Sequence, residues 1–522
     1  MALPEPAREW NPQHNPWLIA LAVMSATFME VLDTSVANVA LPHIAGNLSV
    51  TTEESTWVLT SYLVSNAIIL PMTAWLGNFL GRKRLLIICI ALFTLSSLLC
   101  GLAGSLGFLV LARIFQGAGG GAMLPISQAI LLESFPKEKR GQAMAVFAMG
   151  VVVAPILGPT LGGWITDNYS WRWIFLINLP VGIFAAMVAQ AVVEDPPYIK
   201  EARAEAIDFV GFGLLAIWLG TLQVILDKGQ EEDWFSSDWI RWCTIVSAFS
   251  FVGFLIRELR TGHPVVELRI LKNRNFAIGL ALMTCVGGVL YGTTAALPIF
   301  LQTLMGYPAL QSGMALSPRG IGAFVTTIVV GRLIGKIRNR WLIITGFSLV
   351  ALASFMLGWI NLQMGMSSVV WPSVINGVGV SFIFVPLTTA TMGHLQQQQM
   401  GNATGMFNLM RNLGGSFGIA FVTTYIARDA QVHQAAMSRH FTALDPTFQQ
   451  QLGAITAALK TQTGFAASEQ AYHIIYSRLL DQAKLWAFVD NFRLFGLLCL
   501  ACVPLVFLFK KVKPGAAKVA AH

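Results

Sequence analysis

The chain has 522 residues, of which 55% are hydrophobic and only 11% are charged, and its formal net charge is +8. A soluble domain carries roughly 25% charged residues because its surface faces water. Most of the surface of this chain must therefore face something other than water, and an ordinary soluble multidomain protein is excluded. The basic residues are spread over short clusters between apolar runs rather than gathered on one domain, which disfavours nucleic-acid binding.

Apolar runs long enough to cross a bilayer recur along the whole chain. A spanning helix needs about 20 predominantly apolar residues. We therefore predict an all-α polytopic membrane protein with 14 transmembrane helices. The predicted spans are 17–41, 56–76, 85–105, 107–131, 141–165, 171–193, 207–227, 239–257, 276–302, 311–333, 341–361, 367–392, 402–427 and 486–509.

The charges of the loops predict an orientation. The loops between the spans alternate in charge, and the one at 228–238 is acidic. Because loops rich in Lys and Arg stay in the cytoplasm, both termini are predicted to be cytoplasmic. The polar segment 1–16 has no short apolar run followed by a cleavage site, so no cleavable signal peptide is expected. The basic segments are 82–84, 137–140, 257–274, 336–340 and 510–518.

One connection, 428–485, is much longer than the others and largely polar. A structureless loop of this length is unusual in a compact protein, and Tyr472, Ile475 and Leu479 recur at helical spacing. We therefore predict that it contains helices on the outer side. Two interpretations remain open: a solvated helical hairpin over the mouth of the protein, or a docking surface for a partner protein.

A few charged residues lie within the predicted spans, where each costs at least ~2.5–3.5 kcal/mol on insertion scales. Glu30 and Asp33 share one face of the first span, and Arg113 and Arg411 lie in the fourth and thirteenth. Asp33 lies ~12 Å and Arg113 ~9 Å below the outer ends of their spans, so the two side chains can meet.

An acid beside a cation in a membrane suits proton coupling. Burial and a neighbouring cation act in opposite directions on the proton affinity of a carboxylate. Movement of the cation, or entry of water, would therefore change that affinity. The alternative for Asp33 and Arg113 is a permanent ion pair that locks two helices together.

The fifth span is rich in glycine and proline. Gly158 and Gly162 form a G-x-x-x-G pattern, which lets helix backbones approach closely, and proline removes a backbone donor and favours a bend. A bent helix with a flat face suits a sliding contact between two halves, although ordinary tight packing explains the pattern nearly as well. The residues are Gly150, Pro155, Gly158, Pro159, Gly162 and Gly163.

Signals for enzymatic chemistry are weak. The string at 331–337 resembles a Walker motif but is one residue short and lacks the Ser or Thr that would hold magnesium. Neither a nucleophile elbow nor a His or Cys cluster with metal-ligand spacing is found, and the pair Cys499 and Cys502 lies within a span. We therefore expect no enzyme activity, no metal site and no cofactor.

Four motifs in chain order resemble those of one transporter family. They are 32–42 in the first span, 77–84 after the second, 113–117 in the fourth and 150–163 in the fifth. On these motifs the chain resembles the major facilitator superfamily, and within it the fourteen-span drug:proton antiporters of the EmrB type. The stretch 77–84 lacks an Asp that the family motif usually carries, and Glu30 stands where this branch typically has Gln.

The resemblance implies two six-helix bundles plus two extra central helices. The N-terminal bundle would cover 17–193, the extra helices and a linker 194–275, and the C-terminal bundle 276–509, between tails at 1–16 and 510–522. A cytoplasmic gating loop would contain Gly77, Gly81, Arg82 and Arg84. A substrate cavity would lie between the bundles, with Asn38, Gln116, Gln128, Tyr291, Asn408 and Arg411 as its candidate polar lining.

The resemblance also implies a function: proton-coupled multidrug efflux across a bacterial inner membrane. Asp33, Glu30 and Arg113 would couple transport to the proton gradient, and the fifth-span motif is associated with export. Pumps of this branch work with a periplasmic membrane-fusion adaptor and an outer-membrane channel, which become expected partners. Two alternatives stay open, namely a proton-coupled importer of a specific solute and a non-transporting membrane protein that binds a partner.

Overall fold

A computed structural model of the chain describes residues 12–136, 139–196, 208–262, 264–334, 336–393, 395, 399–439, 441–442, 445–463 and 467–509. Most of the tail predicted at 1–16, all of the tail at 510–522 and part of the linker within 194–275 lie outside the described residues. The helices are α1 (Pro16–Leu48), α2 (Thr52–Ser55), α3 (Trp57–Leu80), α4 (Arg82–Gly101), α5 (Leu106–Ser134), α6 (Arg140–Asn168), α7 (Trp173–Leu176), α8 (Asn178–Val192), α10 (Phe209–Lys228), α11 (Asp238–Arg260), α12 (Arg274–Thr303), α13 (Ala309–Leu333), α14 (Asn339–Leu357), α15 (Ser367–Met392), α16 (Met400–Ser438), α17 (Pro446–Thr463) and α18 (Ala467–Val506), with short 3-10 turns at Trp234–Ser236 and Leu268–Lys272.

Every predicted span coincides with a long helix or, for the sixth span, with the pair α7 and α8. Within the described part of the chain, 12 helices are long and apolar enough to cross a membrane, and α6 adds a thirteenth if its bent halves count as one span. The protein is therefore an all-helical, multi-pass membrane protein. The bend in α6 is 40° and lies between Pro155 and Thr160, within the predicted glycine- and proline-rich segment.

Three helices are longer than the spans predicted for them. α1 continues to Leu48, α16 continues to Ser438, and α18 begins at Ala467 rather than near 486. Apolar composition marks the part of a helix that faces lipid, whereas backbone hydrogen bonding continues wherever the following residues favour it. The span ends predicted from hydropathy were therefore too short at these places.

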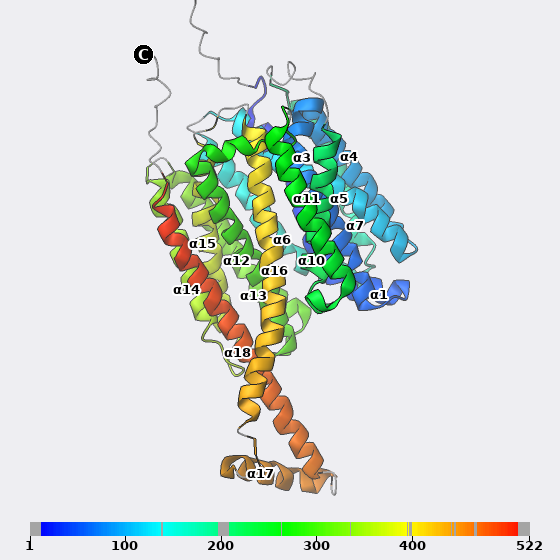
Figure 1. The fold of residues 1–522 in the computed structure, drawn as a ribbon, viewed down its shortest axis with the longest axis vertical. Helices are drawn as coiled ribbons and strands as arrows, with labels where there is room; N and C mark the ends of the chain where they lie inside the picture. The colour runs from blue at the N-terminus through cyan, green and yellow to red at the C-terminus, as the bar shows by residue number, and fades with distance from the viewer. Residues whose placement is uncertain are drawn as a thin grey trace, which may run out of the picture.

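The spanning helices pack in two groups that follow one another in the sequence (Figure 1). α1, α3, α4, α5, α6 and α8 contact one another, as do α12, α13, α14, α15, α16 and α18. The two groups meet where α6 packs on α13 and α15, and where α16 packs on α3 and α5.

The helices α10 and α11 pair with each other at the edge of the bundle. α10 packs on α3 of the first group and on α16 of the second, and Ser416 Oγ on α16 donates a hydrogen bond of 2.9 Å to Gln223 Oε1 on α10. These helices are central in the sequence, but α11 is peripheral in space, with only 17% of its most apolar window buried.

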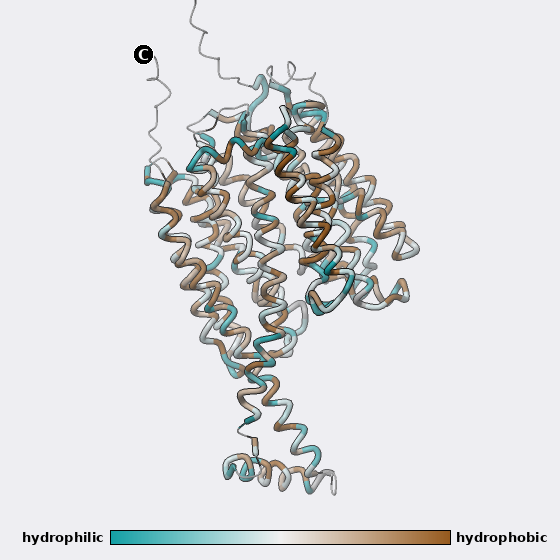
Figure 2. Tube along the Cα trace, viewed as in Figure 1, coloured by the Kyte–Doolittle hydropathy of each residue, from teal (hydrophilic) through white to brown (hydrophobic). Residues whose placement is uncertain are grey.

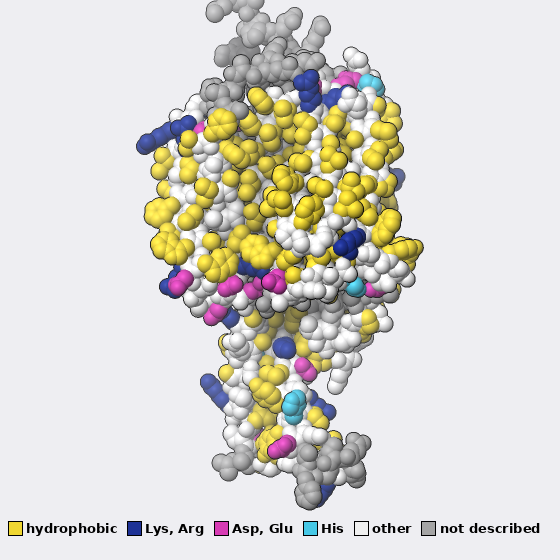
Figure 3. All heavy atoms as spheres, turned by 90° about the vertical axis from the view of Figure 1, so that its right-hand side faces the viewer, with side chains coloured by type: hydrophobic (Ala, Val, Ile, Leu, Met, Phe, Trp, Pro, Cys, Tyr) yellow, Lys and Arg dark blue, Asp and Glu magenta, His cyan; other side chains and the backbone are white. Residues whose placement is uncertain are grey.

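The outer surface has the polarity expected for a membrane protein. Apolar residues dominate the helices of the bundle, and polar residues gather at its two ends (Figure 2). On the face shown in Figure 3, hydrophobic side chains form a broad belt, and most charged side chains lie at its rims. A hydrocarbon environment favours this arrangement because it cannot solvate charge.

The long connection 428–485 contains helices, as predicted, and forms an extension of the bundle. α16 and α18 continue beyond the bundle, cross, and carry α17 across their far end (Figure 1). The tip has a small core of its own, formed by Leu452, Ala471 and Ile475 with Phe448 and Leu459 packed against it. The extension projects away from the bundle (Figure 1).

Glycines set the close contact between α12 and α16 in the second group. A Cβ at Gly418 would lie 2.3 Å from the carbonyl oxygen of Gly288, and a Cβ at Gly414 would lie 2.1 Å from that of Thr284. Both neighbours are backbone atoms, so a side chain at either position forces the helices apart.

We therefore predict that Gly418→Leu lowers the stability of the protein by about 1–3 kcal/mol or more, since overpacking of a tight contact costs this much. The thermal unfolding midpoint of the purified protein in detergent measures the effect. Gly213→Leu on α10 is the matched control, because a Cβ at Gly213 has nothing within 4 Å. Equal midpoints for the two variants would contradict the prediction.

Candidate functional site

The Asp33 carboxylate lies at the centre of a buried polar cluster in the first group of helices. Asp33 Oδ2 lies 2.7 Å from Arg113 Nη1 on α5. Asp33 Oδ1 accepts hydrogen bonds from Gln116 Nε2 at 3.0 Å and from Asn178 Nδ2 on α8 at 2.6 Å. All four residues are buried. One carboxylate thus connects α1, α5 and α8, and the contact that the predicted depths allowed is present.

Arg113 is held on several sides. Its Nε donates to the carbonyl oxygen of Val58 at 3.0 Å, and its Nη1 donates to Gln116 Oε1 at 2.7 Å. The guanidinium carbon lies 4.2 Å from the centroid of the Tyr62 ring, a cation–π contact that is strongest where water is excluded. Its Nη2 has no hydrogen-bond partner in the described part of the chain. The Tyr62 ring therefore stabilises one face of the Arg113 guanidinium.

Glu30 lies one helical turn before Asp33 and is much less well hydrogen-bonded. Its Oε1 accepts from Tyr62 Oη and Asn66 Nδ2, each at 3.4 Å. Its Oε2 is buried without a hydrogen-bond partner among the described residues. Tyr62 therefore links the two sites, because its ring contacts Arg113, the partner of Asp33, and its hydroxyl contacts Glu30.

The glycines of α5 make room for this cluster. A Cβ at Gly120 would lie 2.5 Å from Tyr62 Oη, and a Cβ at Gly117 would lie 2.4 Å from the Tyr62 carbonyl oxygen. A Cβ at Gly121 would lie 2.6 Å from the carbonyl oxygen of Asn66. Any larger residue at these positions would push α3, with Tyr62 and Asn66, away from α5.

Across the contact between the groups, α16 places two polar residues, Asn408 and Arg411, against the first half. Asn408 Nδ2 donates to Gln128 Oε1 on α5 at 2.7 Å, and both residues are buried. Arg411 is also buried, and two of its nitrogens have no hydrogen-bond partner among the described residues. It acts electrostatically on Glu30, although these two described side chains form no direct ion pair.

The residues predicted to line a substrate cavity differ in their surroundings. Gln116 belongs to the Asp33 cluster, and Gln128 and Asn408 bond to each other. Asn38 is exposed and donates to the carbonyl oxygen of Thr34 at 3.1 Å. Tyr291 is half-buried, and its ring packs against Gly415 on α16.

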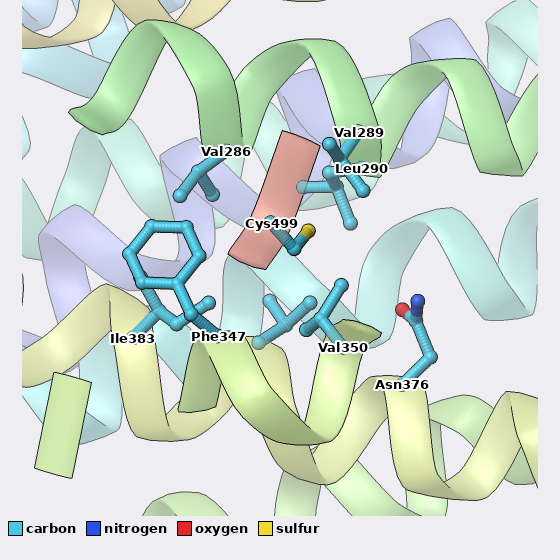
Figure 4. A pocket seen from close by; sticks show the side chains of 9 residues that line it. Val286, Val289, Leu290, Phe347, Val350, Asn376, Ile383 and Cys499 are labelled. Atoms are coloured by element: carbon cyan, nitrogen blue, oxygen red, sulfur yellow. The ribbon is translucent and has the colours of Figure 1, made fainter. Parts of the chain in front are cut away.

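A small cavity in the second group of helices is too small to hold a substrate. It lies between α12, α14, α15 and α18, with Val286, Phe347 and Cys499 among its lining residues (Figure 4). Its volume of about 10 Å³ is near the minimum that a single water needs. We interpret it as a packing void.

At the end of the bundle that carries the basic loops, Arg82 is buried beside a carboxylate. Its Nη2 lies 2.8 Å from Glu133 Oε1, and its Nε lies 3.2 Å from Glu133 Oε2. A Cβ at Gly77 would lie 3.1 Å from Arg82 Nη1, and a Cβ at Gly401 on α16 would lie 2.6 Å from it. The guanidinium is thus enclosed between the two groups of helices.

The turn before Arg82 requires glycine. Gly81 has a φ of +92°, and a Cβ there would lie 2.6 Å from a carboxylate oxygen of Asp195. The other oxygen of Asp195 accepts a hydrogen bond of 2.9 Å from the backbone nitrogen of Lys83, at the start of α4. Three of the four predicted gating residues, Gly77, Gly81 and Arg82, therefore lie together, whereas Arg84 is exposed.

The glycine- and proline-rich α6 packs directly on the helix that carries both acids. Ser35 Oγ donates to the carbonyl oxygen of Pro155 at 3.0 Å, and a Cβ at Gly158 would lie 2.2 Å from Ser35 Oγ. A Cβ at Gly162 would lie 2.9 Å from a methyl group of Val36, and one at Gly150 would lie 2.3 Å from Met24 Cε. At Gly163 the nearest atom is 3.9 Å away, and the side chain of Pro159 lies outside the described residues.

Several members of the Asp33 cluster were not predicted from the sequence. Asn178 and Ser97 complete it, because Gln116 Nε2 and Asn178 Nδ2 also donate to Ser97 Oγ at 2.7 and 3.2 Å. Tyr62 and Asn66 were likewise not identified. An uncharged polar residue inside an apolar span is a weak signal, since such residues also join helices without any further role.

Chemically, this arrangement can hold or release a proton. A carboxylate, a cation and neutral donors are enclosed together, with a second acid one turn away. An enclosed carboxylate near a cation changes its proton affinity when the cation moves or water enters.

Comparisons with known proteins agree with this description. The model of the Major Facilitator Superfamily matches residues 23–419. The fatty acid resistance protein FarB of Neisseria gonorrhoeae is 37% identical over 497 residues, which cover 94% of this chain and 96% of that protein. The multidrug export proteins EmrB of Haemophilus influenzae and Escherichia coli K12 are 38% and 37% identical, each over 83% of this chain and 84% of theirs.

Solved transporter structures have the same fold. The human organic anion transporter MFSD10 superposes with a TM-score of 0.58 at 14% identity, over 93% of this chain and 100% of that one. A double tryptophan mutant of XylE gives a TM-score of 0.56 at 13% identity, over 96% of this chain and 100% of the other. Since the family model covers most of the sequence and relatives above 30% identity cover more than two thirds of it, the chain belongs to the major facilitator superfamily.

Proposed function

We propose that this protein exports hydrophobic or amphipathic small molecules, including antibiotics, from the bacterial cytoplasm and is driven by the proton gradient across the inner membrane. The observation that carries the proposal is the buried contact of 2.7 Å between Asp33 and Arg113. The similarity to multidrug export proteins supports the direction of transport and the substrate class.

In this proposal the chain crosses the membrane fourteen times. α6 crosses as one bent helix, and α16 crosses although Arg411 makes it less apolar, because it packs along α12 and α18. Two six-helix bundles, 17–193 and 276–509, then enclose the transport path. The helix α10 attaches to α3 of the first bundle and to α16, and α11 packs on α10.

The structure corresponds to a state closed at the end with the basic loops, which the proposal places in the cytoplasm. There the two bundles approach closely: a Cβ at Gly141 on α6 would lie 2.7 Å from Ile334, and one at Gly331 on α13 would lie 3.0 Å from Ala145. Arg82 is enclosed against Gly401 at the same end. These contacts must separate for substrate to enter from the cytoplasm.

We assign the proton to Asp33, shared with Glu30. In this state the Asp33 carboxylate is held by Arg113, Gln116 and Asn178. Protonation would weaken its hold on Arg113, since an ion pair is lost. α5 carries both Arg113 and Gln128, so a shift of Arg113 reaches the contact with α16.

We predict that Asp33→Asn abolishes proton-driven transport, because Asn preserves the size of the side chain but cannot exchange a proton. Purified protein in liposomes is given a pH gradient and a fluorescent dye substrate, and the gradient-driven flux should fall at least tenfold. Asp167→Asn serves as the control, because that side chain is 68% exposed and away from the cluster. Flux equal to that of the wild type in Asp33→Asn would refute the assignment.

We further propose that the outer extension binds a periplasmic adaptor, which joins the pump to an outer-membrane channel. Its helices have a core of their own around Leu452 and Ile475, so they present a folded surface beyond the bundle (Figure 1). A docking element of this kind needs no contact with the transport path.

Shortening the extension tests this role. Gln434 Nε2 on α16 and Tyr476 Oη on α18 are hydrogen-bonded at 3.0 Å, so residues 436–475 can be replaced by a short Gly/Ser linker. We expect the variant to transport dye in liposomes at the wild-type rate but to lose drug resistance in whole cells. Equal loss in both assays would assign the extension to folding instead.

A further inference from the structure

Where the extension leaves the bundle, α16 and α18 bring two aspartates and a histidine together. Asp429 and His433 are one turn apart on α16, and Asp490 projects from α18. Their side chains are partly buried, with exposed fractions of 19%, 26% and 30%. One ligand atom from each lies within 4.8 Å of the other two. The transport proposal makes no use of this cluster.

The spacing of these atoms matches a metal coordination sphere. His433 Nε2 lies 3.3 Å from Asp429 Oδ2 and 3.2 Å from Asp490 Oδ2. With bonds of about 2.0–2.1 Å to a tetrahedral zinc ion, neighbouring ligand atoms lie about 3.3 Å apart.

Hydrogen bonds within this cluster cannot satisfy both aspartate oxygens that face His433. Both carboxylates face the same ring atom, Nε2, which carries at most one hydrogen. The contact with Asp490 has hydrogen-bond geometry. The equally short contact with Asp429 does not, and Asp429 Oδ2 is a buried oxygen without a hydrogen-bond partner among the described residues. A cation in front of Nε2 would satisfy all three atoms at once.

The surroundings also suit a metal. Arg493 Nη1 lies 3.2 Å from Asp490 Oδ1, the oxygen that does not face His433, and Arg493 Nε donates to the carbonyl oxygen of Gly358 at 3.2 Å. Such outer contacts orient a ligating carboxylate. A hollow of about 250 Å³ opens along α16 beside Asp429, between Tyr425 and Val432.

We propose that Asp429, His433 and Asp490 bind a divalent transition metal ion of the zinc class, which clamps α16 to α18 at the base of the extension. The imidazole favours a transition metal, whereas calcium and magnesium prefer an all-oxygen set. Two carboxylates and a neutral imidazole balance the charge of the ion. The pattern was missed in the sequence because Asp490 lies 57 residues from His433.

Titration calorimetry with zinc chloride tests the site, using the full-length protein in detergent after removal of any affinity tag and of bound metal by chelation. We expect one zinc ion per chain, with affinity reduced at least tenfold in His433→Ala and in Asp490→Asn. His433→Cys, which supplies another zinc ligand, should retain binding. His473→Ala is the matched control, because His473 is exposed on α18 in the extension.

A second measurement keeps the proposal testable if a variant is poorly folded. Zinc should raise the thermal midpoint of the wild type and slow amide exchange in 425–438 and 480–493, and should do neither in His433→Ala. Absence of zinc binding to the wild type, or equal binding by His433→Ala and Asp490→Asn, would overturn the proposal. So would a wild type whose midpoint is insensitive to zinc yet depends on imidazole protonation, because His433 would then act as a cation itself.

Discussion

The packing of the first bundle depends on the buried ion pair between Asp33 and Arg113. Burying two charges costs several kcal/mol per ion unless good geometry and further hydrogen bonds compensate, and removing one partner costs about 3–5 kcal/mol. Asp33 accordingly accepts from three side chains, and Arg113 donates to a backbone carbonyl and stacks on Tyr62. Polar residues on α4 and α8, and the glycine face of α5, are consequences of this one requirement.

Small residues then determine where helices approach and where they can part. In a membrane, helices gain little from burying apolar surface against each other, so association depends on close packing and polar contacts. α6 meets α1 where Gly158 faces the side chain of Ser35, and α12 meets α16 through Gly418 and Gly288, where the two backbones are in close contact. Close approaches between the two bundles, such as Gly141 to Ile334 and Gly401 to Arg82, lie at the end that carries the basic loops. Close packing within each bundle would let the bundles move as units in the proposed transport cycle.

The sequence predicted the helices well because a hydrocarbon environment requires long apolar runs, and it predicted the Asp33 contact because two charges of opposite sign at one depth have few alternatives. It did not predict Asn178 or Tyr62, since uncharged polar residues have many possible partners. It also placed Gln116 with the cavity rather than with Asp33, because a residue number does not give the direction in which a side chain points. The cluster at Asp429 could not be found at all, because it depends on how α16 and α18 cross.

The second bundle contributes a buried cation of its own, Arg411. Unlike Arg113, Arg411 forms no ion pair with a carboxylate among the described residues. Arg411 acts on Glu30 across the contact between the bundles, yet Glu30 Oε2 and two nitrogens of Arg411 lack hydrogen-bond partners among the described residues. The attraction between the bundles at this point therefore depends on the charge of Glu30. In the proposed transport cycle, a proton on Glu30 would remove that attraction, and a negatively charged substrate near Arg411 would compete for it. Proton and substrate would then act on the same contact between the bundles.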